Sequence, residues 1–131
     1  MGAEGAGARP VVAVARDLFF ATKIGDAARR AGRAIVFPRR DEDLLAALRL
    51  HQPSLLILDL TAEGLDFGAL LRALRADPAT AALPVLAYTS HVHWKQHRDL
   101  HPLCSRVLTK EEFSRQLPSL LQEPPAGAHD G

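Results

Sequence analysis

Three side chains capable of chemistry stand at the ends of short apolar stretches. They are the carboxylate of Asp59, the hydroxyl of Thr89 and the amine of Lys110. Residues 55–60 form the longest of these stretches, and an unbroken apolar run of that length is typical of a strand buried on both faces. In open parallel sheets, ligands and chemistry collect at the carboxyl ends of the strands. We therefore expect the three groups to meet at one sheet edge, with Asp59 at the centre.

Arg16 and Asp17 follow the first apolar stretch, residues 11–15, and are predicted to reach the same edge. Two carboxylates, Asp17 and Asp59, would then face two cations, Arg16 and Lys110. A site of this composition is neutral without a metal ion.

The elements that must position these residues alternate along the chain. Strand patterns are predicted over residues 11–15, 34–37, 55–59, 85–89 and 106–109. Each is followed by a segment with helical character, and the helix at 91–100 has the weakest pattern because it is polar and rich in histidine. Asp41 and Asp66 are predicted helix N-caps, Gly32 a helix-ending glycine, and Pro118 a kink or early stop in the last helix. The alternation predicts an α/β fold, a doubly wound five-stranded parallel sheet of order 2-1-3-4-5, flavodoxin-like in type.

Length and composition limit the function classes. The 131 residues suit one domain, predicted over residues 10–121 with frayed tails at 1–9 and 122–131. A net charge of +1 gives no basic surface for nucleic acid. Cys104 is the only cysteine, so no disulfide within the chain can form, and no apolar run is long enough for a membrane helix. We expect a cytoplasmic protein that binds neither nucleic acid nor membrane.

The strand-end residues resemble the receiver domain of bacterial response regulators, of the chemotaxis-regulator kind. The similarity extends over residues 11–121 and includes the local amino-acid sequences of residues 66–78 and 83–89. The resemblance implies that Asp59 occupies the phosphoacceptor position, that Thr89 is the switch hydroxyl, and that Lys110 is the cation that contacts the phosphoryl group.

Departures from the family pattern point to an atypical receiver, or pseudo-receiver. Ala15 and Arg16 stand where the family carries its acidic Mg²⁺-binding pair, which leaves Asp17 as the residual acid. Glu111 replaces the usual proline after the lysine, and Val107 replaces an aromatic switch residue. We therefore expect no cofactor, and we hypothesise that the Arg16 guanidinium takes the place of the metal and forks onto Asp59.

The resemblance implies a stand-alone signalling module rather than an enzyme. It would act by protein–protein interaction with a histidine kinase or an effector, with little or no phosphorylation, and self-association as a homodimer is compatible with it. The alternative is a Mg²⁺-dependent phosphoreceiver in which a histidine kinase phosphorylates Asp59 and Asp17 helps to hold the metal. A third hypothesis, a small flavodoxin-like ligand-binding domain, lacks phosphate-binding glycines.

Two further features lie in the polar segment 91–101. Its four histidines fall near helical spacing, which is compatible with a metal site, but a solvated polar helix is the favoured interpretation because no fourth partner or carboxylate is arranged with them. Trp94 belongs to the same segment. Since tryptophan is enriched at the energetic centres of interfaces, Trp94 marks a candidate partner surface.

Overall fold

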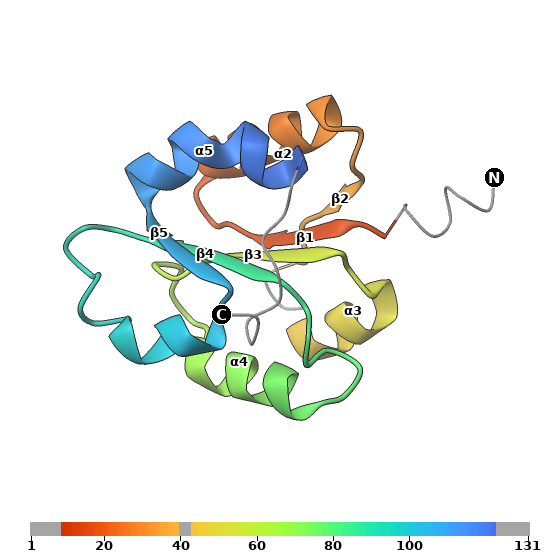
Figure 1. The fold of residues 1–131 in the computed structure, drawn as a ribbon, viewed down its shortest axis with the longest axis vertical. Coiled ribbons are helices and arrows are strands. Elements are labelled where there is room, and N and C mark those ends of the chain that lie inside the picture. The colour runs from red at the N-terminus through yellow and green to blue at the C-terminus, as the bar shows by residue number, and fades with distance from the viewer. Residues whose placement is uncertain (1–8, 40–42, 123–131) are drawn as a thin grey trace.

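The computed structural model describes residues 9–39 and 43–122, and Figure 1 shows one sheet between two layers of helices. All strand pairings are parallel, and the strand order is β2-β1-β3-β4-β5. The predicted fold class and strand order are confirmed. The strands are β1 Val11–Val14, β2 Ile35–Val36, β3 Leu55–Asp59, β4 Val85–Thr89 and β5 Arg106–Thr109.

Helices cover both faces of the sheet. On one face lie α2, Leu18–Arg30, and α5, Lys110–Gln122; on the other lie α3, Leu44–His51, α4, Phe67–Ala76, and the 3₁₀ helix η1, Arg98–Leu103 (Figure 1). Each strand-to-strand connection in a parallel sheet must cross over one face. The helices between consecutive strands are these crossovers, and because they lie on both faces the fold is doubly wound.

The central strand β3 contributes side chains to the apolar cores on both faces of the sheet. Its side chains alternate, so that Leu55 and Ile57 contact the core under α2 and α5, while Leu56 and Leu58 contact the core under α3 and α4. Ile57 is 0% exposed. Full burial of each such side chain contributes roughly 1.5–3 kcal/mol, so β3 is the strand on which both cores depend.

Local capping chemistry sets the helix ends. Asp66 caps α4 by accepting from the Ala69 amide at 2.9 Å, as predicted, and Gly32 after α2 has the positive φ of 71° that glycine tolerates best. For α3 the cap is Asp43, which directly precedes Leu44 and accepts from Ala46. The predicted cap Asp41 is therefore wrong for α3, and it lies outside the described residues.

Two predicted elements differ from the structure. Residues 91–97 form turns instead of an α-helix, and only η1 follows, because this segment has little apolar periodicity. The last helix, in contrast, does not stop at Pro118. It continues to Gln122 because four apolar side chains bury its inner face: Phe113, Leu117, Leu120 and Leu121.

One residue of each predicted tail belongs to the described structure. Arg9 donates from Nε to the Gln52 carbonyl at 2.9 Å, and Gln122 belongs to α5. The rest of both predicted tails lies outside the described residues. Within the part of the chain that is described, no helix is long and apolar enough to cross a membrane.

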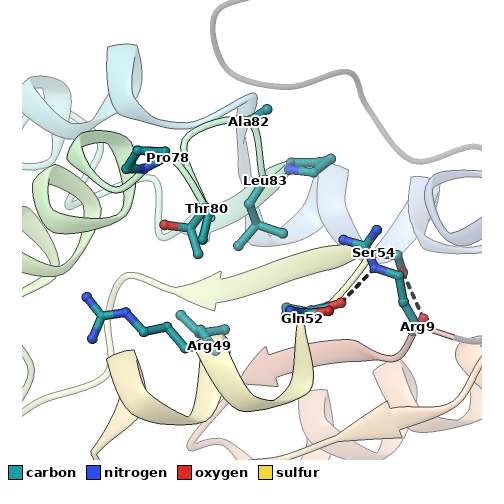
Figure 2. A pocket seen from close by; sticks show the side chains of 12 residues that line it. Arg9, Arg49, Gln52, Ser54, Pro78, Thr80, Ala82 and Leu83 are labelled. Atoms are coloured by element: carbon teal, nitrogen blue, oxygen red, sulfur yellow. Dashed lines mark hydrogen bonds between the residues drawn. The ribbon is translucent and has the colours of Figure 1, made fainter.

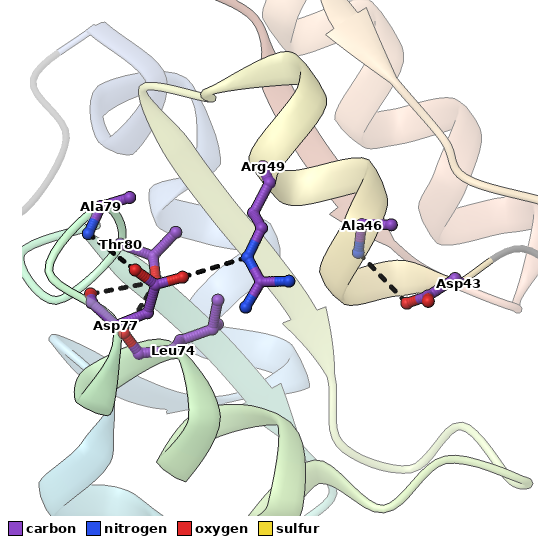
Figure 3. Close-up of polar contacts among 7 residues, drawn as sticks. All are labelled: Asp43, Ala46, Arg49, Leu74, Asp77, Ala79 and Thr80. Atoms are coloured by element: carbon purple, nitrogen blue, oxygen red, sulfur yellow. Dashed lines mark hydrogen bonds and ion pairs between the residues drawn. The ribbon is translucent and has the colours of Figure 1, made fainter.

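Arginine side chains close the amino ends of the strands. A cavity of about 770 Å³ lies there, with Arg9, Arg49, Gln52 and Ser54 along its rim (Figure 2). The Arg49 guanidinium reaches from α3 to the Asp77 carboxylate at the end of α4, with 3.0 Å between Nε and Oδ2 (Figure 3). This pair joins two neighbouring helices across the mouth of the cavity.

Candidate functional site

A cleft of about 380 Å³ opens at the other end of the strands. Its lining includes Arg16, Asp17, Asp59 and Lys110, together with the loop of residues 61–63 after β3. The structure therefore brings four of the predicted strand-end residues to one place. They come from the loop after β1, the end of β3 and the start of α5, which is the convergence expected at the carboxyl edge of a parallel sheet.

Asp59 is held rigidly at the floor of this cleft. The residue is 2% exposed, and its Oδ1 accepts hydrogen bonds from the Thr61 amide at 2.9 Å and from the Thr61 hydroxyl at 2.5 Å. Sequence analysis missed Thr61, although a Thr two residues after an Asp is a common signal for such a local bond. The two donors compensate part of the cost of burying the carboxylate.

Arg16 does not make the predicted fork onto Asp59. Within the described residues the Arg16 guanidinium forms no hydrogen bond or ion pair, although the residue is half-buried and lines the cleft. Thr61 donates to Oδ1 of Asp59, and within the described residues no donor reaches Oδ2. The cation therefore lines the same cleft as the carboxylate without a bond to it.

The Asp17 side chain caps a helix. Its Oδ1 accepts from the amides of Phe19 at 2.8 Å and Phe20 at 3.4 Å, so it is the N-cap of α2. A carboxylate in this position interacts favourably with the helix dipole and with otherwise unpaired backbone donors. The cap leaves only Oδ2 of Asp17 for use as a metal ligand.

Lys110 contributes a second cation that no carboxylate neutralises directly. Its Nζ lies 5.5 Å from the centre of the Phe20 ring, and within the described chain it makes no ion pair. Phe20 therefore orients the amine over the cleft by a cation–π contact. As the first residue of α5, Lys110 has a fixed backbone position.

Thr89 is fully buried and does not line the cleft. Its Oγ1 lies 2.8 Å from Nδ1 of His97, a residue that sequence analysis considered only as part of the histidine spacing. Burial lowers the pKa of His97, the neighbouring His93 and His101 lower it further, and Asp59 opposes them. A neutral imidazole therefore faces the Thr89 hydroxyl.

Tyr88 is a second residue that sequence analysis missed. Its ring stacks on Phe113 at 4.4 Å, and its hydroxyl is buried without a hydrogen-bond partner in the described structure. Burial, and then the carboxylates of Asp59 and Asp17, raise the pKa of Tyr88 well above its ordinary value. The buried phenol thus keeps its proton beneath the acidic side of the cleft.

The described residues contain no group of three or more His, Cys, Asp or Glu side chains arranged to hold a metal ion. Trp94 differs from expectation in two ways: it lies in a turn, and it is half-buried because its ring meets His101 edge to face at 4.7 Å. Part of its surface therefore serves internal packing.

Three solved structures with the same fold come from bacterial response regulators or sensor kinases. The chemotaxis response regulator CheY4 of Vibrio cholerae matches with a TM-score of 0.73 and 16% identity, over 88% of this chain and 97% of that one. The receiver domain of a sensor histidine kinase from Pseudomonas aeruginosa, which has magnesium coordinated in its cleft, matches with a TM-score of 0.73 and 18% identity over 88% and 95%.

A third structure, the signal receiver domain of a DNA-binding response regulator from Colwellia psychrerythraea, has a TM-score of 0.70 and 18% identity, over 87% of this chain and 98% of that one. No family model matches the sequence, and no curated protein matches it. At these identities the likeness defines the fold. The chain has the receiver fold, a flavodoxin-like α/β arrangement.

Proposed function

We propose that the chain is an atypical receiver domain of two-component signalling that acts by binding a signalling protein, with little or no phosphorylation of Asp59. The receiver fold and the positions of Asp59, Thr89 and Lys110 support the signalling class. The partner is a histidine kinase or an effector, and the surface around the half-buried Trp94 is our candidate contact. The domain works as a signalling module, not as an enzyme with a substrate of its own.

The observation that carries the pseudo-receiver proposal is the state of Asp17. Besides Asp59 and Glu63, it is the only acid that lines the cleft, and its Oδ1 is bonded to two amides of α2. Mg²⁺ requires near-octahedral oxygen ligands, usually one or two carboxylates together with water and phosphate oxygens, and the cap leaves only Oδ2 of Asp17 for this use. Arg16 adds a positive charge on the same side, which opposes a divalent cation further.

One arrangement favours the alternative, a Mg²⁺-dependent phosphoreceiver. Asp59 and Lys110 line the same cleft, as the transfer of a phosphoryl group to the carboxylate would require. In that case the second carboxylate oxygen of Asp17, Oδ2, would face the metal, since the cap uses only Oδ1. The Thr89 hydroxyl must also turn from His97 toward Asp59.

Incubation with acetyl phosphate and Mg²⁺, followed by intact-mass measurement, separates the two functions. We expect the unmodified mass for the wild-type chain. The matched variant Ala15→Asp/Arg16→Asp restores two carboxylates at the cleft and should gain Mg²⁺ affinity, measured by titration calorimetry. A phosphoryl adduct on the wild-type chain that disappears in Asp59→Asn would establish the alternative instead.

A further inference from the structure

Two histidines after β4 are arranged as a pair. The His97 amide donates to the His93 carbonyl at 3.2 Å, so the two residues lie one helical turn apart although the segment is not an α-helix. Their ring centres are 6.2 Å apart. Two imidazoles that bind one tetrahedral zinc ion at about 2.1 Å through nitrogen have ring centres about 5 Å apart, so a shared ion requires the two rings to approach each other by about 1 Å.

Both rings are oriented through the same nitrogen. His93 Nδ1 lies 2.6 Å from the Ser90 hydroxyl, and His97 Nδ1 lies 2.8 Å from the Thr89 hydroxyl. These hydroxyls belong to consecutive residues at the end of β4. Metal-binding histidines commonly use one ring nitrogen for such an orienting bond and the other for the ion. Here that other nitrogen is Nε2 in both rings.

The surroundings suit a metal ion. Both histidines line a cavity of about 720 Å³, together with Glu63, Asp66 and Gln96. The cavity has room for water ligands.

We propose that His93 and His97 bind a divalent transition-metal ion, with Zn²⁺ as the representative, through their Nε2 atoms. Imidazole nitrogen suits Zn²⁺, Ni²⁺ and Cu²⁺ and does not suit Mg²⁺, so this site is chemically distinct from the Asp59 cleft. Water molecules complete the coordination.

Zinc titration of the tag-free chain by calorimetry tests the proposal. Every protein in the titration carries His129→Ala, which removes a histidine that lies outside the described residues. We expect saturable binding of one ion per chain. His93→Ala and His97→Ala should each weaken binding by at least about tenfold, and Ser90→Ala by about tenfold through the loss of the orienting bond.

The matched control is His91→Ala, because His91 is exposed in the same segment but contacts neither ring of the pair. It should change the zinc affinity by less than about twofold, and circular dichroism should show that every variant is folded. Nitrogen chemical shifts of the histidine rings supply a second readout, since zinc at Nε2 requires a proton on Nδ1 of both His93 and His97. Unchanged zinc affinity in His93→Ala/His97→Ala, or binding that does not saturate at millimolar zinc, would overturn the proposal.

Discussion

The two ends of the sheet differ in how their cations are used. At the amino ends, Arg33 donates to the Leu121 carbonyl at 2.6 Å, Arg49 pairs with Asp77, and Arg75 donates to three backbone carbonyls. At the carboxyl ends, neither Arg16 nor Lys110 has a hydrogen bond or an ion pair within the described chain. Both edges carry cationic side chains, but within the described chain only those at the amino edge form hydrogen bonds or ion pairs.

This contrast separates structural from functional charge. A buried carbonyl without a donor costs free energy, so an arginine that donates to several of them stabilises the fold. A cation that lies over a cleft without a partner contributes little to stability and remains available to an anionic group. The comparison assigns the amino edge to folding and the carboxyl edge to recognition, and four measurements test it.

The largest effect is expected at Arg75. Its Nε donates to the Leu103 carbonyl and its Nη1 to the carbonyls of Ala81 and Leu83, so it fastens α4 to the segments before β4 and β5. Arg75→Ala should lower the free energy of unfolding by about 2–4 kcal/mol, because hydrogen bonds from a charged donor are lost. Urea denaturation measures this.

Arg72 is the matched control, since it is exposed on the same helix. Arg72→Ala should stay within about 0.5 kcal/mol of wild type. Equal losses of unfolding free energy in the two variants would mean that the hydrogen bonds from Arg75 to the carbonyls do not stabilise the fold.

Asp17→Ala should cost about 1 kcal/mol, because α2 loses its side-chain cap. Asp17→Ser keeps an oxygen acceptor and should lose less. Thermal unfolding of both variants provides the comparison. If Asp17→Ala leaves stability unchanged but abolishes Mg²⁺ binding seen in the wild type, the residue belongs to the cleft and not to the helix.

A smaller effect concerns pH. Burial, together with His93 and His101, lowers the pKa of His97 in the folded state, so the unfolded chain binds its proton more readily. This part of the stability is complete above the ordinary histidine pKa of about 6.5 and is lost as the pH falls below that value. Urea denaturation at about pH 7.5 and pH 5.5 should show a smaller loss for His97→Asn than for wild type. Identical losses would contradict the role assigned to His97.

The smallest effect is the coupling between Arg16 and Asp59. Because no bond joins them, a double-mutant cycle of Arg16→Ala and Asp59→Asn should give an interaction energy below about 0.5 kcal/mol. Chemical denaturation of the four proteins measures it. A coupling of more than about 1 kcal/mol would restore the fork that the sequence suggested and would make the carboxyl edge resemble the amino edge.

The sequence by itself determined the α/β class, the strand order and the central place of β3. These follow from short-range patterns: an apolar run of strand length, alternation with amphipathic segments, and a limited set of crossover topologies. It also located Asp59 and Lys110 at one edge, because carboxyl ends of parallel strands must meet. The helix caps were less certain, since Asp41 and Asp43 are equally suitable residues two positions apart.

Only the tertiary structure decided what the strand-end groups bond to. Arg16 was predicted to bond to Asp59, but the donors to this carboxylate are the amide and hydroxyl of Thr61, two residues away. The Thr89 hydroxyl meets His97 in a segment, residues 91–97, that folds as turns where a helix was expected. Even for partners that are near in sequence, the bond depends on angstrom-scale side-chain positions set by packing, and residue types and spacing do not fix positions at that scale.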